Sequence, residues 1–309
     1  PTSAMWFKNL TLLRLQRPGD ITLEKLEERL AEHAYHPVGA LETSSEGWCP
    51  PLGKAEAPWI QRAPGGALIA LRREDKVLPA AAIRERVALR VDEIEAREHR
   101  KLGRKAREAV RDEIIRIMLP QAFSQSRTTF AYLDLANGWL MVDTPSVKRA
   151  EDLVAQLRKT LEGFPVRPIT TRERPMTVLT RWISGINLPQ GVELESECEL
   201  KSPETDGGIV KARRHDLFAP EITRHVEAGK EVSRLALNWS ERMSLILDEN
   251  LSVRRLRFLQ VMEESDSQTG DLDEASRFDQ ELALMALELG NFVPVLLDWF
   301  GGEASPEAA

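Results

Sequence analysis

Cysteine is scarce in this sequence, and so are the patterns that would bind a metal. The 309 residues include two cysteines, Cys49 and Cys198, which stand far apart and form no CxxC pair. This usage argues against a disulfide framework or a structural zinc site and suits a cytoplasmic protein. His33 and His36 lie three residues apart, but HAYHP runs into a proline, which favours a helix end over a metal site. We therefore expect no metal.

Long apolar runs and nucleotide-binding motifs are also missing. No run approaches about 18 apolar residues, and the first residues, PTSAMWFKNL, lack the layout of a secretion signal. We therefore predict no contact with a membrane. The chain has no GxxxxGKS/T, no GxGxxG at a strand–helix junction and no GxSxG. An ATPase, a Rossmann dehydrogenase and a serine hydrolase thus lack their usual motifs. We predict neither a cofactor nor a small-molecule substrate.

One enzymatic alternative rests on acidic residues. Asp134 and Asp143 flank a predicted hairpin and Lys148 follows, as in a nuclease whose carboxylates hold a metal while a lysine assists the water. The other interpretation is that Asp134 precedes a turn and Asp143 ends a strand. We favour this second interpretation, predict no catalytic residues, and do not expect an enzyme.

The order of predicted elements indicates an α+β fold with antiparallel sheets and helices. The strands are expected at 5–15, at 67–72, on both sides of Asn137-Gly138 and repeatedly within 191–258, and the helices from Thr22 and at 80–119, 146–162, 221–229 and 274–299. Gly103 predicts a turn that splits 80–119 into two helices, and Asn137-Gly138 predicts a tight hairpin. The Gly- and Pro-rich segment 37–66 should be irregular or form short strands. Ser146 is the expected N-cap of its helix, whose inner face should carry Val147, Ala150, Val154 and Leu157.

Charge is distributed unevenly along the chain. The formal net charge is −7, and residues 261–309 alone carry −11. Residues 97–107 nevertheless carry a net charge of +5, from Arg97, Arg100, Lys101, Arg104, Lys105 and Arg107. On one continuous helix these cations and Arg111 would occupy an arc of about 160°. Such an arc is typical of a solvated helix face with i,i+4 ion pairs, but its unbalanced surplus and its many arginines also suit phosphate binding.

A second basic cluster lies in strand-like sequence. Lys211, Arg213 and Arg214 belong to GIVKARRH, and Arg254, Arg255 and Arg257 belong to VRRLRF. Alternation along a strand places Lys211 with Arg213, and Arg255 with Arg257, on one face. An ordinary polar outer face is the other interpretation. Because no run of aromatic residues accompanies these cations, we expect them to hold a duplex by its backbone and not to read bases.

Several blocks of sequence occur in the order found in one bacterial family. They are WFKNL (6–10), GWCPPLG (47–53), LPQAFS (119–124), NGWLMVD (137–143), AEDLVAQLRKTLEGFPV (150–166), ELKSPETDGGIVKARRHDL (199–217), EITRHVEAGKEVSRLALNW (221–239) and RFDQELALMALEL (277–289). Together they make the chain resemble the recombination-associated RdgC proteins, from Met5 to about Glu303. None of these motifs is catalytic. The sequence departs from the family at Gln121, where an arginine is common, which changes the charge expected beside Phe123.

The resemblance implies a non-enzymatic, cytoplasmic, nucleoid-associated protein that binds double-stranded DNA with little sequence preference and antagonises the RecA recombinase. It also implies an elongated, horseshoe-shaped monomer, two copies of which close into a ring-shaped homodimer around a positively lined hole. The two interfaces would each be self-complementary, as two-fold symmetry requires. Residues 5–78 and 121–175 would form the centre region, 79–120 the helical tip and 176–309 the base region.

The same resemblance assigns expected site residues. Phe123 would be the gate residue that enters an apolar pocket of the partner's tip; without the resemblance it would be a core phenylalanine after a helix end. The helix around Leu282–Leu297 would contribute to the second interface. The expected DNA-binding residues are Arg97, Arg100, Lys101, Arg104, Lys105, Arg107, Lys211, Arg213 and Arg214. The alternative function is a protein-interaction module that regulates recombination without touching DNA.

Overall fold

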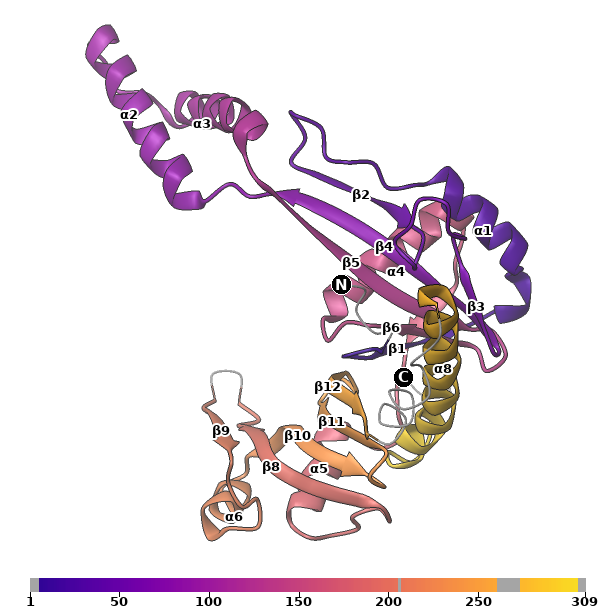
Figure 1. Cartoon of the computed structure of the whole chain (residues 1–309). Helices are drawn as coiled ribbons and strands as arrows, with labels where there is room; N and C mark the ends of the chain where they lie inside the picture. The colour runs from indigo at the N-terminus through magenta and orange to yellow at the C-terminus, as the bar shows by residue number, and fades with distance from the viewer. Residues whose placement is uncertain (1–5, 205–206, 260–272, 305–309) are drawn as a thin grey trace. The chain divides into compact units, whose positions relative to one another are not determined.

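The computed structural model describes residues 6–204, 207–259 and 273–304, and the chain divides into two compact units (Figure 1). Unit one comprises residues 1–29, 50–69 and 129–309, and unit two comprises residues 30–49 and 70–128. Three elements pass from one unit into the other: α1 (Leu23–Glu32), β4 (Gly66–Lys76) and β5 (Ser124–Asp134). The predicted α+β class with antiparallel sheets is confirmed.

The larger sheet has the strand order β2-β4-β5-β6-β1-β7, with β3 also paired to β4. Its other strands are β1 (Thr11–Leu15), β2 (Ser44–Cys49), β3 (Gln61–Ala63), β6 (Trp139–Val142) and β7 (Val166–Pro168). The predicted hairpin at Asn137-Gly138 joins β5 to β6, and Gly138 has the positive φ (74°) that such a turn needs. Gly66 is required by close approach, because a Cβ there would lie 1.7 Å from the carbonyl oxygen of Leu133.

The smaller sheet lies wholly in unit one and has the order β12-β11-β10-β8-β9. Its strands are β8 (Val192–Lys201), β9 (Ile209–Arg213), β10 (Glu231–Trp239), β11 (Met243–Asp248) and β12 (Val253–Phe258). This confirms the strands predicted within 191–258, and α6 (Pro220–Glu227) interrupts them as expected. The sheet joins β1 through a bridge between Leu10 and Val253, whose backbone groups exchange two hydrogen bonds of 2.9 and 2.8 Å.

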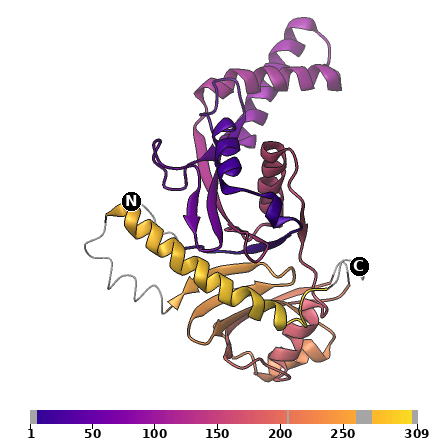
Figure 2. The ribbon, with the colours of Figure 1, turned by 90° about the vertical axis from the view of Figure 1, so that its right-hand side faces the viewer.

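The core of unit one forms where α8 (Glu274–Asp298) crosses the smaller sheet (Figure 2). The helix buries a continuous apolar stripe that includes Leu282, Leu289 and Phe292, and the strands β1 and β6 contribute to the same cluster. An 18-residue stretch of α8 has a mean hydropathy of 1.3, which is apolar enough to span a membrane. However, 56% of that stretch is buried inside the protein. Within the described residues it is a core helix.

Unit one also contains the helices α4 (Val147–Leu161) and α5 (Pro175–Ile183). One prediction about α4 is confirmed, another is wrong, and α5 was not predicted. Ser146 caps α4 as predicted, since its hydroxyl accepts a hydrogen bond from the amide of Arg149 at 3.3 Å. Val147 does not belong to the inner face, because it is 44% exposed. α5 was not predicted: nine residues are too few to show a helical period clearly, although five of them are buried.

Unit two carries a pair of helices, α2 (Ala80–Glu98) and α3 (Arg104–Met118), followed by the short 3-10 helix η2 (Leu119–Gln121). The predicted split of 80–119 is confirmed. The chain leaves α2 at His99, in the left-handed region (φ 52°), and α3 starts after Gly103. Because the helix is not continuous, the single arc of cations does not exist. A small cluster of Val91, Leu102 and Val110 holds the pair together.

Candidate nucleic-acid interface

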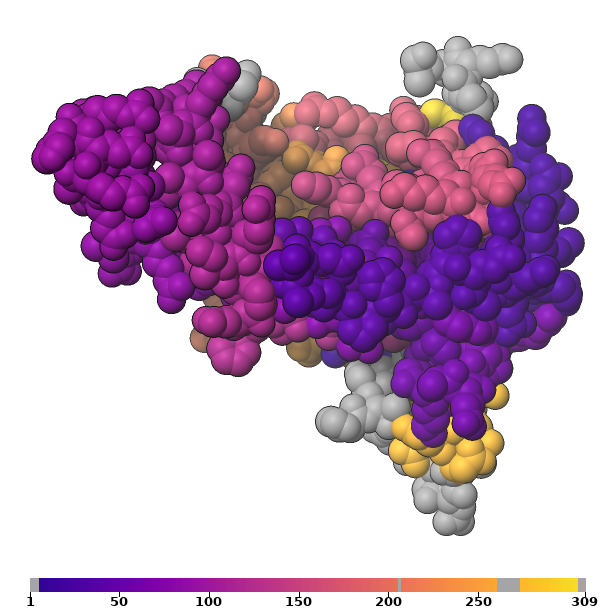
Figure 3. Space-filling model, turned by 90° about the horizontal axis from the view of Figure 1, so that it is seen from above, coloured from indigo at the N-terminus to yellow at the C-terminus, as the bar shows by residue number. Residues whose placement is uncertain are grey.

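The six predicted cations of residues 97–107 gather around the connection between α2 and α3. Arg97 lies in the last turn of α2, Arg100 and Lys101 in the connection, and the other three in the first turn of α3. The side chains for which ion pairs occur are 52–92% exposed. The space-filling view shows the helix pair in purple at the left (Figure 3). The connection between the helices thus brings together six cations that the sequence spreads over eleven residues.

Carboxylates partly neutralise this cluster. Glu98 pairs with Arg97 at 4.0 Å and with Arg100 at 2.9 Å, and Glu108 pairs with Arg104 at 3.0 Å. Glu95 pairs with Lys101 at 2.7 Å and with Arg107 at 2.9 Å. Five of the six cations thus pair with three carboxylates, and counting all six leaves a local surplus of three positive charges. Arg97, Arg100 and Arg104 are 71–92% exposed, and ion pairs of such side chains are weak, so these three arginines stay available to a phosphate.

Glu95 has a structural role that was not predicted from the sequence. Its side chain is 8% exposed, and its Oε1 accepts a hydrogen bond from the amide of Leu102 at 2.9 Å. The hydrogen bonds from Lys101 and from that amide lower the pKa of Glu95 to about 2. Arg107 also donates to the carbonyl of Leu102 at 3.1 Å. Lys101 and Arg107 thus help to close the helix pair, and their contribution to a ligand would compete with this contact.

Replacing Glu95 with glutamine is expected to loosen the helix pair. The folded-state pKa of about 2 lies below the ordinary glutamate pKa of 4.5, so the ionised carboxylate stabilises the fold above about pH 4.5 and loses this effect as the pH falls toward 2. Hydrogen exchange at the Leu102 amide should be faster in Glu95→Gln at pH 7, and the difference from the wild type should shrink on acidification. Glu93→Gln, at an exposed residue that pairs with Arg90, is the control. A difference independent of pH would contradict this account.

The cations of the second predicted cluster lie on the smaller sheet, in unit one. Lys211 pairs with Glu199 at 3.2 Å, and Arg213 with Glu197 at 3.6 Å, as direct cross-strand neighbours. Arg214 follows the end of β9 with a positive φ of 53°. The predicted site residues therefore fall into two groups, one in each unit.

Phe123 does not belong to a core. Its side chain is 87% exposed, directly after η2, while Leu119 in η2 is buried. The carbonyl of Phe123 accepts a hydrogen bond from Val77 at 2.7 Å, and Val77 is itself 46% exposed. The interpretation of Phe123 as a core phenylalanine is therefore wrong. Because so little of the side chain is buried in its own chain, Phe123 is available to contact another molecule. The neighbouring Gln121 is exposed and uncharged.

The two aspartates of the nuclease alternative lie apart. Asp134 is buried and accepts hydrogen bonds from the backbone and side-chain amides of Asn137 at 3.0 and 2.8 Å, so it organises the hairpin turn. Asp143 accepts from the amides of Lys8 and Asn9 at 3.1 and 2.8 Å. Asp134 ends β5 opposite Trp139, the first residue of β6, and Asp143 follows the last residue of β6, so they lie about 13 Å apart along the strand at about 3.3 Å per residue. They cannot share a metal ion. Among the described residues, no group of three or more His, Cys, Asp or Glu is placed to hold one.

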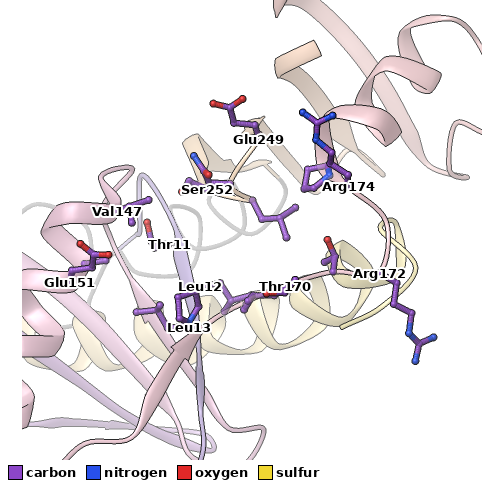
Figure 4. A pocket seen from close by; sticks show the side chains of 17 residues that line it. Thr11, Leu12, Leu13, Val147, Glu151, Thr170, Arg172, Arg174, Glu249 and Ser252 are labelled. Carbon is purple, nitrogen blue, oxygen red and sulfur yellow. The ribbon is translucent and has the colours of Figure 1, made fainter. Parts of the chain in front are cut away.

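A further hollow of about 490 Å³ in unit one lies between β1, β7, α4 and the turn after β11 (Figure 4). Its lining is mostly apolar, with Leu12, Leu13 and Ile169 among its walls. Arg174 at its edge pairs with Glu231 at 2.9 Å. Within the described residues, no hydrogen bond joins a hydroxyl side chain of this lining to a carboxylate, so the hollow gives nucleophilic catalysis no support.

Comparison with known proteins gives full-length matches. The family model described as "RdgC: Putative exonuclease, RdgC" matches residues 5–303. A protein named recombination-associated protein RdgC from Halorhodospira halophila is 42% identical over 305 residues, which cover 98% of this chain and 100% of the relative. Proteins of the same name from Laribacter hongkongensis and Aeromonas hydrophila are 43% and 40% identical over 299 residues, or 97% of this chain and 99% of each relative.

Proposed function

Because this chain belongs to the RdgC family of recombination-associated proteins, we propose that it binds double-stranded DNA without sequence preference and limits the access of the RecA recombinase to it. The bound form is a homodimeric ring that encircles or clamps the duplex. It acts without catalysis or a cofactor, in the cytoplasm, as part of the nucleoid. The centre, tip and base regions expected from the sequence are the parts of this ring.

The observation that carries the proposal is the surplus of charge between α2 and α3. Six cations are grouped there with only three carboxylates, in a protein whose net charge is −7. Concentrating positive charge against this overall balance costs self-repulsion, which a bound phosphate backbone would relieve. The cluster contains four arginines, whose planar guanidinium groups fit phosphate oxygens. The contacts would be to the backbone, which explains a lack of sequence preference.

The ring explains the exposed apolar side chain in the same unit. Phe123 enters an apolar pocket of the partner's tip, and burial of this side chain stabilises one of the two interfaces. The helix around Leu282–Leu297 contributes to the second interface. Since Leu287 on α8 is 58% exposed, this helix retains an apolar residue outside the core of unit one.

The test of the proposed function is duplex affinity as a function of salt, measured on two unrelated sequences. We expect similar affinities on both and a steep loss with salt, with a slope of about −0.9 per neutralised phosphate. If no duplex binds at low salt, the DNA-binding proposal fails. The protein-interaction module would then be the better function, and a recombination partner should be sought.

The family description also names an exonuclease, which is a different class of function. The structure gives this alternative no metal-binding carboxylate cluster within the described residues. An end-labelled duplex from the same titration, incubated with Mg²⁺, is expected to keep its length. Progressive shortening that is abolished by changing one carboxylate would establish the exonuclease.

A further inference from the structure

The outer face of the smaller sheet is hollowed and lined with arginines. Val253, Leu256 and Phe258 of β12 point into the core of unit one, so the arginines between them point to the opposite face. The hollow has a volume of about 590 Å³. Its charged walls are Arg213, Arg214, Arg255, Arg257, Glu195 and Glu197. Four guanidinium groups against two carboxylates make this face a second basic surface, separate from the α2–α3 cluster.

Two irregularities in the strands shape the hollow. Arg255 has a positive φ of 49°, and the pairing of β12 with β11 slips between Ser244 and Ile246, which marks a β-bulge. On the other side, residues 195–197 of β8 stand opposite Ala236 alone. A non-glycine residue at positive φ costs stability, and such strain concentrates where side chains must be aimed. The bulges direct Arg255 and Glu197 toward the hollow.

Glu197 forms ion pairs with arginines from both edge strands of the sheet. Its carboxylate lies 2.6 Å from Arg255 on the edge strand β12 and 3.6 Å from Arg213 on the edge strand β9. Arg255 reaches it across β11 and β10, where the hollow is floored by small side chains, Ala236 and Ser244. The side chains of Arg213 and Arg255 are 72% and 60% exposed. A carboxylate held between two guanidinium groups presents the oxygens that a phosphate would present.

We propose that Glu197 is a built-in competitor for a DNA phosphate. In the free protein its carboxylate occupies the space between Arg213 and Arg255; on duplex binding a phosphate takes this place, with Arg214 and Arg257 alongside. The exchange needs little rearrangement, because both arginines are more than half exposed and ion pairs of such side chains are weak. Glu197 would thereby keep the arginines in position and limit the strength of non-specific binding. This inference rests on the proposed function and adds Arg255 and Arg257 to the expected binding residues.

The test compares Glu197→Gln with Glu193→Gln, a control at an exposed residue of the same strand. Both variants remove one negative charge, but within the described residues no ion pair joins Glu193 to a cation. We measure affinity for a fluorescein-labelled duplex at a fixed salt concentration of about 0.1 M. Glu197→Gln should bind about three- to tenfold more tightly than Glu193→Gln, the scale of one phosphate contact. Arg255→Ala should cost more affinity in the Glu197→Gln background than in the wild type, because the freed guanidinium then contacts phosphate.

The outcomes separate this inference from the proposed function. If the wild type binds no duplex, the proposed function fails, and the inference fails with it. If the wild type binds but Glu197→Gln equals Glu193→Gln, or binds more weakly, the competitor is refuted while DNA binding stands. If circular dichroism shows that Glu197→Gln folds poorly, the duplex affinity of Arg255→Ala in the wild-type background tests the inference instead. An unchanged affinity would then exclude this arginine from the site.

Discussion

Reversing the charges of Arg97, Arg104 and Lys105 to glutamate is expected to weaken duplex binding at least about 100-fold at about 0.1 M salt. These side chains lie on the two helix ends that border the α2–α3 connection, and none of them contacts Glu95. The variant therefore removes phosphate contacts without breaking the contact that closes the helix pair. The salt slope should flatten by about 2.7, at about 0.9 for each lost contact. Fluorescence anisotropy over a salt series measures both quantities.

A control with the same net charge separates a local site from general electrostatics. Changing Lys25, Lys148 and Lys159 to glutamate also shifts the formal charge by −6, at exposed residues of unit one. This control should keep most of the affinity. Equal losses in the two variants would mean that net charge governs binding and that the α2–α3 cluster is no site. Unchanged affinity in the first variant would mean that the duplex binds elsewhere on the chain. Loss of duplex binding with recombination still inhibited would favour the protein-interaction module.

Replacing Phe123 with glutamate is expected to weaken the proposed homodimer by about 30- to 1,000-fold in dissociation constant, which corresponds to about 2–4 kcal/mol for losing an aromatic anchor of the interface. The folding of the monomer should not suffer, because the side chain is 87% exposed in the isolated chain. Sedimentation equilibrium measures the dissociation constant, and thermal unfolding checks the fold. The variant should also release circular DNA more readily at high salt than the wild type does. The reason is that the proposed ring would open at the Phe123 interface even while its second interface stays closed.

Phe218→Glu is the matched control for Phe123. Phe218 is the same residue type, is 56% exposed and lies in unit one. It should leave the dimer unchanged. If both variants dissociate the dimer equally, exposed apolar surface in general drives association. If Phe123→Glu associates as the wild type does, Phe123 is not an interface residue.

Local sequence signals determined most of the secondary structure. Asn137-Gly138 specified a hairpin because its backbone must take positive φ, and Gly103 with its neighbours specified two helices in place of one. Alternation specified the strands of the smaller sheet, since one face is buried under α8. The misses were α5, which is too short to show its period, and the exposure of Val147. Ordered blocks along the whole chain also sufficed to identify the family.

Only the tertiary structure decided which charges meet. The sequence counted a surplus between Arg97 and Arg107, but Glu95 closes the helix pair because the connection folds back over it, and no spacing rule relates Glu95 to Leu102 and Arg107 together. Arg255 and Glu197 are separated by 58 residues and two strands, and two bulges bring their side chains within 2.6 Å. The reason is physical: periodicity reports which face a residue occupies, whereas the partner on that face is set by register, bulges and strand order, which depend on the whole packed sheet.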